Sequence, residues 1–210
     1  MSTAPPTIAI QQITGLILAG GQGSRMGHVD KGLQPFRGQA MAAHVVARLH
    51  PQVHTLAINA NRHSERYAVL GWPVWPDLQL GFAGPLAGLQ SGLMHCRTDY
   101  LIAAPCDSPL LPIDLVQRLA AALAQKTADA AIAVTDQGLP TQQRHPVFCL
   151  LRKTLLPSLS AYLDQDGRRM EQWFASIATV EVPFDDAQAF SNINTLQELQ
   201  HLEQAHQGQQ

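Results

Sequence analysis

The stretch that decides the fold is residues 16–32, which reads LILAGGQGSRMGHVDKG. An apolar run from Ile13 to Leu18 leads into four glycines within eight residues, a pattern typical of a buried strand that ends in a tight loop. Successive backbone N–H groups in such a loop point into one concavity that binds anions. Arg25 can fork onto phosphate oxygens, and Lys31 adds a compact positive charge. The stretch therefore predicts a polyphosphate site, since an ordinary turn with solvated cations does not need four glycines.

Spacing excludes two other phosphate-binding loops. A P-loop requires Gly-x-x-x-x-Gly-Lys-Ser/Thr, and no lysine of this chain follows a glycine. A dinucleotide fingerprint requires Gly-x-Gly-x-x-Gly with an acidic residue about 20 residues later. Gly21 and Gly23 match it, but Met26 takes the third position, and the next expected strand ends in Asn59 and Asn61. These departures disfavour a hydride-transfer enzyme.

Length and composition fit one globular domain over residues 1–210, because 46% of the residues are hydrophobic and 14% are charged. The net charge of −2 offers no general basic surface for nucleic acid. No apolar run is long enough to cross a membrane, and the N-terminus lacks the features of a signal peptide. Cys96, Cys106 and Cys149 are widely spaced and odd in number, so we expect reduced thiols in a cytoplasmic protein.

Alternating apolar and amphipathic stretches predict alternating strands and helices. The expected strands are 13–18, 56–58, 73–75, 100–104, 130–134, 147–151 and 180–182. The expected helices are 41–49, 85–94, 113–123, 154–163, 169–177 and 195–205, and a polar loop is expected over 138–144. This order predicts an α/β protein with a parallel or mixed sheet covered by helices on both faces.

Polar residues stand where three of these strands end, and such sheets bind ligands beyond the carboxyl ends of their strands. The residues are Asn59, Asp77 and Asp107. The carboxylate of Asp107 could hold Mg²⁺, or Asp107 and Ser108 could simply turn the chain before Pro109. For Asn59 and Asp77 the residues by themselves favour a turn, because Asx residues at strand ends more often form turns.

The motifs together resemble the nucleotidyltransferases that join a nucleoside monophosphate to a phosphorylated acceptor. Within that group the chain most resembles the molybdenum cofactor guanylyltransferases, since relatives that use CTP carry LAAG where residues 18–21 here read LAGG. The matching strings, in order, are LAGG at 18–21, SRMG at 24–27, DKG at 30–32, NANR at 59–62, GPLAG at 84–88, CDSP at 106–109, HP at 145–146 and NINT at 192–195. Their common order over residues 13–200 carries the resemblance.

The resemblance implies a three-layer α/β/α Rossmann-like nucleotidyltransferase fold with a mostly parallel mixed sheet. The N-terminal half would bind GTP and Mg²⁺, and the C-terminal half would bind molybdopterin. The implied GTP-binding residues are Leu18, Ala19, Gly20, Gly21, Lys31, Asn59, Asp77, Gly88 and Asp107. The implied catalytic residues are Arg25, Lys31 and Asp107, with Asp107 as the metal ligand.

The acceptor is expected to meet Asn192, Asn194 and His145, because the two asparagines precede the N-terminus of the expected last helix. Further candidate cations are Arg144, Arg168 and Arg169, although a solvated surface position is the favoured interpretation for each of them. The implied reaction transfers GMP from GTP to the phosphate of molybdenum-molybdopterin and releases pyrophosphate. Transient contacts with cofactor-donor and apo-molybdoenzyme proteins are implied as well. The alternatives are a cytidylyl or sugar-phosphate nucleotidyltransferase, and a nucleotide-binding adaptor without catalytic activity.

Overall fold

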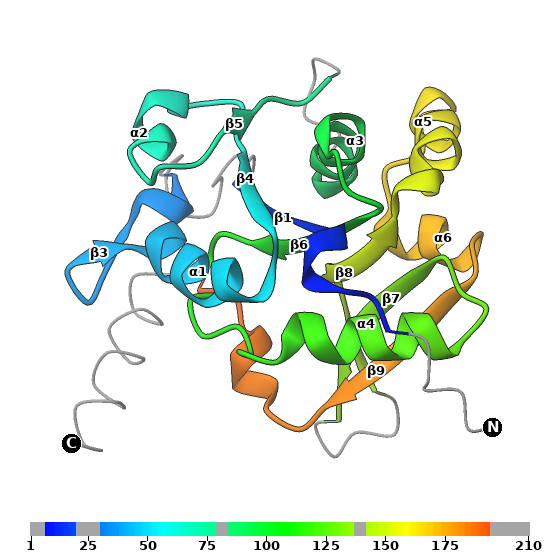
Figure 1. The fold of residues 1–210 in the computed structure, drawn as a ribbon. Helices are drawn as coiled ribbons and strands as arrows, with labels where there is room; N and C mark the ends of the chain where they lie inside the picture. The colour runs from blue at the N-terminus through cyan, green and yellow to red at the C-terminus, as the bar shows by residue number, and fades with distance from the viewer. Residues whose placement is uncertain (1–6, 20–29, 79–83, 137–141, 194–210) are drawn as a thin grey trace.

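A seven-stranded sheet lies between two layers of helices in the computed structural model, which describes residues 7–19, 30–78, 84–136 and 142–193 (Figure 1). The strands are β1 (Ile13–Leu18), β4 (Thr55–Asn59), β5 (Val74–Trp75), β6 (Tyr100–Pro105), β7 (Ala130–Thr135), β8 (Gln143–Arg152) and β9 (Thr179–Phe184). Their spatial order is β5-β4-β1-β6-β8-β7-β9. Within this sheet only β8 runs antiparallel to its neighbours, so the predicted mostly parallel mixed sheet is confirmed.

Both faces of the sheet are buried, which explains why its inner strands are almost continuously apolar. Along β1, Ile13 and Ile17 join one apolar cluster, whereas Leu16 and Leu18 join the other. The first cluster includes residues of α1 (Met41–Leu49), α2 (Ser64–Ala68) and α4 (Leu115–Gln125). The second includes residues of α3 (Pro85–His95), α5 (Leu156–Asp164) and α6 (Met170–Ala175). The protein thus has the three-layer α/β/α architecture.

Short elements and some boundaries differ from the sequence predictions. The hairpin of β2 (Pro35–Phe36) and β3 (Gln39–Ala40) was not predicted, although Arg37 and Gly38 have the positive φ values, 48° and 78°, that a two-residue hairpin loop requires. Helix α2 was also missed, because five residues are too few to show a helical period. The helix expected over 195–205 lies outside the described residues.

The prediction of a polar loop over 138–144 was wrong at its C-terminal end, because Gln143 and Arg144 belong to β8. They pair with Thr135 and Val134 of β7, so backbone pairing extends the strand beyond its apolar part. The polarity of both residues reflects their exposure at the edge of the sheet.

A bulge in β8 opens the sheet on one side. Ile132 pairs with Cys149, but the next residue of β7, Ala133, pairs with His145, which leaves residues 146–148 outside the ladder. Pro146 suits this place because it has no N–H to donate to a neighbour. The pairing of β6 with β8 stops at Ala103 and Cys149, so β8 does not pair with the carboxyl end of β6.

The chain changes direction across the sheet between β1 and β6. From β1 it builds outward through β4 and β5, and it then returns to place β6 on the opposite side of β1. Ligands in such sheets bind beyond the carboxyl ends of the strands at this switch point. The three cysteines are free and buried. Across the described segments, every helix is too short or too polar to span a bilayer.

Candidate active site

The carboxyl ends of β4, β1 and β6 lie side by side at the switch point. Leu18 of β1 is level with Asn59 of β4 on one side and with Pro105 of β6 on the other. Ala19 continues β1 by donating its N–H to the carbonyl of Asn59 at 2.8 Å. Directly after Ala19 come three expected site residues that lie outside the described residues, namely Gly20, Gly21 and Arg25.

Lys31 and Asp107 meet at this edge, although 76 positions separate them. The Lys31 Nζ atom lies 3.1 Å from Asp107 Oδ2, and the two side chains are only 22% and 10% exposed. Because solvent screens such a pair less than a surface pair, the charges fix one another's position. Asp107 stands two residues beyond β6, where its carbonyl accepts the N–H of Ile193 at 2.9 Å.

The donor set at Asp107 fits Mg²⁺ when a phosphorylated substrate is bound. Within the described ranges, no three His, Cys, Asp or Glu side chains gather as a ready-made metal site. Mg²⁺ commonly binds one or two carboxylates and completes its coordination with substrate phosphates and water. A single carboxylate beside a lysine is consistent with that mode of binding.

Tyr67 of α2 supports the segment that carries Lys31. Its hydroxyl donates to Asp30 Oδ1 at 2.5 Å, and the residue is fully buried. Burial raises the pKa of Tyr67 far above its ordinary value, and Cys106 and Asp30 raise it further, so the phenol remains a donor. Asp30 immediately precedes the 3₁₀ turn η3 (Lys31–Leu33). Tyr67 was not identified from the sequence, because α2 is too short to show a helical period. Its hydrogen bond to Asp30 also joins residues that are 37 positions apart.

Asn59, Asn61 and Asp77 form a hydrogen-bonded cluster at the ends of β4 and β5. Asn59 Nδ2 donates to Asp77 Oδ1 at 2.9 Å, and Asn61 Nδ2 donates to Asp77 Oδ2 at 2.7 Å. The backbone N–H of Asp77 donates in turn to Asn61 Oδ1 at 2.8 Å. Asn59 also donates to the carbonyl of Trp75 at 3.0 Å. The amides hold the Asp77 carboxylate in place, and its remaining lone pairs can accept from a ligand.

Gly88 allows α3 to pack against this cluster. A Cβ atom at this position would overlap Asn59 Oδ1 and lie 2.6 Å from Leu18 Cδ2. The close approach therefore requires a glycine. Three expected nucleotide-binding residues, Gly88, Asn59 and Leu18, are thus in mutual contact.

Replacing Gly88 with alanine should displace Asn59 and weaken nucleotide binding. We expect a roughly tenfold higher dissociation constant, equivalent to about 1.4 kcal/mol, together with a loss of about 1–3 kcal/mol of stability from overpacking. Gly92→Ala is the matched control, because a Cβ there would press on Leu16 and Leu101 of the core instead. Calorimetric titration with nucleotide and thermal unfolding would measure both effects. An unchanged affinity in Gly88→Ala would contradict the assignment.

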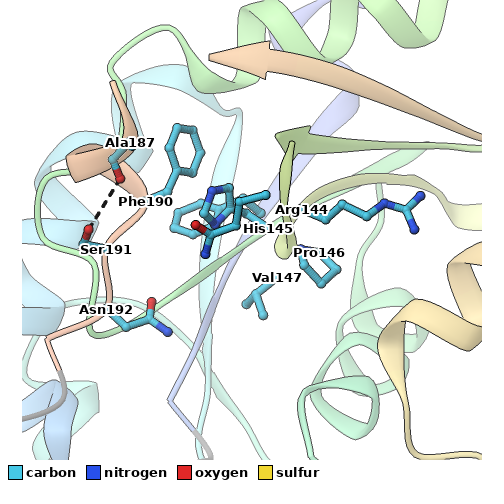
Figure 2. Close-up of a pocket in the computed structure, with 10 residues that line it drawn as sticks. Arg144, His145, Pro146, Val147, Ala187, Phe190, Ser191 and Asn192 are labelled. Atoms are coloured by element: carbon cyan, nitrogen blue, oxygen red, sulfur yellow. Dashed lines mark hydrogen bonds between the residues drawn. The ribbon is translucent and has the colours of Figure 1, made fainter. Parts of the chain in front are cut away.

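A cavity of ≈ 400 Å³ lies beside the bulge of β8 (Figure 2). Its lining comes from residues 143–148 and from Ala187, Phe190, Ser191 and Asn192. The cavity thus occupies the side on which β8 does not pair with the end of β6. It brings together two of the expected acceptor-binding residues, His145 and Asn192, while Asn194 lies outside the described residues.

His145 is fixed in this cavity by two neighbours. Its ring stacks on Phe190 with centroids 4.9 Å apart, and Nε2 shares a hydrogen bond of 2.8 Å with Thr135 Oγ1. Burial lowers the pKa of His145 below its ordinary value, which favours the neutral imidazole. Figure 2 shows the ring of His145 beside that of Phe190. Sequence reasoning did not identify Thr135 or Phe190, although Thr135 follows a buried apolar run in the same way as Asn59.

Asn192 connects this cavity to the Lys31–Asp107 pair. Ser108 Oγ donates to Asn192 Oδ1 at 2.8 Å, and the adjacent Ile193 N–H donates to the carbonyl of Asp107. The turn after β6 therefore contacts both the charged pair and the cavity wall. Ser108 is fully buried and was weighed from the sequence only as a turn former.

Arg144 lines the cavity but its guanidinium is paired with Glu181, and the other two candidate arginines are not part of the lining. Arg144 forms an ion pair of 2.5 Å with Glu181, and its guanidinium points away from His145 and Asn192 (Figure 2). Arg168 donates to the carbonyls of Leu163 and Gly167, so it stabilises the segment that connects α5 to α6. Neither Arg168 nor Arg169 is among the residues that line the cavity.

His145 should make folding stability depend on pH below about 6.5. Its folded-state pKa is lowered from the ordinary 6.5, so the unfolded chain binds a proton there before the folded protein does. Stability is therefore fully present above that pH and falls as the pH is lowered. We expect His145→Gln to lose less stability than the wild type between about pH 7.5 and about pH 5.5, by a small margin because solvent screens the half-buried ring.

Denaturant unfolding at the two pH values would measure this contribution. His54→Gln is the control, because the side chain of His54 is exposed. Identical pH dependence in wild type and His145→Gln would contradict the prediction.

Comparisons with known proteins agree with this architecture. The family model described as MobA-like NTP transferase domain matches residues 15–180. The molybdenum cofactor guanylyltransferase of Cupriavidus metallidurans is 55% identical over 91% of this chain and 95% of its own length. The enzyme of the same name from Cupriavidus necator is 56% identical over 91% of this chain and 96% of its own length.

A solved structure of molybdopterin-guanine dinucleotide biosynthesis protein A from Archaeoglobus fulgidus has the same fold. It superposes with a TM-score of 0.75 over 93% of this chain and 99% of that chain, at 20% sequence identity. The extent and identity of the sequence matches decide the family. This chain belongs to the molybdenum cofactor guanylyltransferases, a family of nucleotidyltransferase enzymes.

Proposed function

We propose that this protein transfers GMP from GTP to the phosphate of molybdenum-molybdopterin, giving molybdopterin guanine dinucleotide and pyrophosphate. The observation that carries the proposal is the Lys31–Asp107 pair at the switch point, joined through Ser108 and Asn192 to a separate cavity. A nucleotidyltransferase must hold two phosphorylated substrates in line, and this edge offers a place for each. The names of the relatives support the choice of GTP and molybdopterin.

The nucleotide would bind over β1, β4 and β6. Lys31, with Arg25 from the glycine loop, would neutralise negative charge on the α-phosphate and on the leaving pyrophosphate. The Asn59–Asn61–Asp77 cluster and Gly88 would shape the contact with the nucleoside. Mg²⁺ bound by Asp107 and the phosphates would supply additional positive charge where the transition state becomes more negative.

The acceptor would bind in the cavity lined by His145 and Asn192. An oxygen of its terminal phosphate attacks the α-phosphorus, a new P–O bond forms, and the bond to the bridging oxygen of the β-phosphate breaks. Pyrophosphate leaves with that electron pair. The attacking oxygen is already ionised near neutral pH, so no general base is required, and positioning dominates the catalysis. In this scheme His145 orients the acceptor as a neutral imidazole.

The test is a pyrophosphate-release assay with Mg²⁺, with GTP, CTP or ATP as the donor and with molybdopterin or a sugar phosphate as the acceptor. Nucleotide analysis of the product would accompany the assay. We expect release with GTP and a product that contains GMP. Preference for CTP would favour a cytidylyltransferase, activity only with a sugar phosphate would indicate the other alternative, and no turnover with authentic acceptor would favour an adaptor.

A further inference from the structure

The geometry points to Tyr67 as a positioning residue that acts through Asp30 to place the ammonium group of Lys31. The inference rests on the proposed function only in that Lys31 is taken to contact nucleotide phosphates. Tyr67 has no place of its own in that mechanism, since its hydroxyl is buried beneath the site.

The hydrogen bond from Tyr67 fixes the start of the turn that carries Lys31. The side chain of Asp30 accepts from the Tyr67 hydroxyl, while its carbonyl accepts from the N–H of Leu33 and from Gln34 Nε2, each at 3.3 Å. The N–H of Gln34 then donates to the carbonyl of Lys31 at 3.0 Å. Asp30 is thus held through both its side chain and its carbonyl, which restrains the backbone at the next residue, Lys31.

The same hydroxyl also reaches the segment that carries Asp107. A Cβ atom on Gly32 would lie 2.5 Å from the Tyr67 hydroxyl oxygen and 3.0 Å from Cys106 Sγ, so these groups converge on one glycine. Cys106 immediately precedes Asp107, belongs to the same buried cluster as Tyr67, and helps to raise the pKa of the phenol. One buried phenol therefore hydrogen-bonds to the segment that carries Lys31 and lies close to the segment that carries Asp107, and the side chains of these two segments meet in the 3.1 Å contact of Lys31 with Asp107.

Packing alone does not account for a hydroxyl at this position. A phenylalanine ring would fill the same apolar space, whereas a buried hydroxyl costs free energy unless it is hydrogen-bonded. The bond to a carboxylate is of the strong, charge-assisted kind, which is directional as well as favourable. A charged side chain at a phosphate site must be held in a defined orientation, because small displacements of such a group reduce the reaction rate strongly.

The test compares Tyr67→Phe in the wild-type background and in a Lys31→Gln background. We expect kcat/KM for nucleotide transfer to fall roughly tenfold in the first and less than about twofold in the second, because the effect passes through Lys31. Equal losses in both backgrounds, or no loss in the first, would overturn the inference. Tyr100→Phe is the matched control, since that hydroxyl accepts from Arg152 Nη1 at 3.0 Å at the opposite end of β6.

Asp30→Ala is the second variant, chosen because it removes the acceptor of this hydrogen bond but leaves the buried ring intact should Tyr67→Phe fold poorly. It should show the same loss, and combining it with Tyr67→Phe should add nothing further. Additive losses would overturn the proposed path through Asp30.

Hydrogen exchange of the ligand-free protein gives a readout that needs no turnover. The amides of Leu33 and Gln34 should exchange roughly tenfold faster in Tyr67→Phe than in wild type or in Tyr100→Phe. Unchanged exchange would overturn the positioning role even if transfer falls. A wild-type protein that transfers no GMP would refute the proposed function, while the exchange measurement would still decide the role of Tyr67.

Discussion

Asp107→Asn is expected to lower GMP transfer by about 10³-fold and to raise the Mg²⁺ concentration needed for half-maximal rate. The change removes the negative charge at the end of β6 but keeps the size of the side chain. The carbonyl of residue 107 would still accept from Ile193, so the fold should persist. The two effects are expected together because a neutral amide binds Mg²⁺ less well than a carboxylate does.

Steady-state rates across a Mg²⁺ titration, with circular dichroism and thermal unfolding, would check this result. Asp114→Asn is the control, because Asp114 immediately precedes α4 and forms an exposed pair with Arg118 at 3.7 Å, where the proposed mechanism has no role. Near-normal transfer by Asp107→Asn would remove the metal assignment and with it the proposed mechanism.

Lys31→Gln is expected to lower kcat/KM by about 10²–10³-fold, since one cation facing the developing phosphate charge is lost. Unlike Asp107→Asn, it should leave the Mg²⁺ requirement unchanged or lower it. The reason is that the Asp107 carboxylate loses a positive neighbour that lies 3.1 Å away and competes with a metal for the same charge. The two variants therefore separate the roles of the paired residues.

The same Mg²⁺ titration measures this prediction. Lys126→Gln serves as its control, because that lysine is exposed at the end of α4. A strongly increased Mg²⁺ requirement in Lys31→Gln would show that the lysine supports the metal rather than the phosphates.

Much of the fold was predictable because apolar runs and helical periods can be recognised within short stretches of the sequence. The apolar strands 13–18 and 100–104 have both faces covered, and they appear within one residue of the predicted ends. Helix α2 and the β2–β3 hairpin were missed because their stability depends on packing against neighbours rather than on an internal period. Arg144 was placed in a loop for a related reason, since only pairing with β7 extends β8 that far.

The candidate site was predictable where a residue stands at a strand end. Asn59, Asp77 and Asp107 were singled out on that ground, and the shared direction of the strands brings them to one edge. The supporting residues Tyr67 and Ser108 were not predictable, because their side-chain hydrogen bonds go to Asp30 and Asn192, which lie 37 and 84 positions away along the chain.

The sequence alone determined the α/β class and the resemblance to one family of transferases, and it predicts phosphate binding by residues 16–32. Each of these depends on periodicity or motif spacing, which the linear chain contains. Only the tertiary structure decided that Lys31 pairs with Asp107 and that a cavity lies at His145 beside the bulge of β8. It also decided that Arg144 forms an ion pair with Glu181. These features follow from strand order and register, which bring together side chains that are far apart along the chain. A local sequence pattern contains no information about such neighbours.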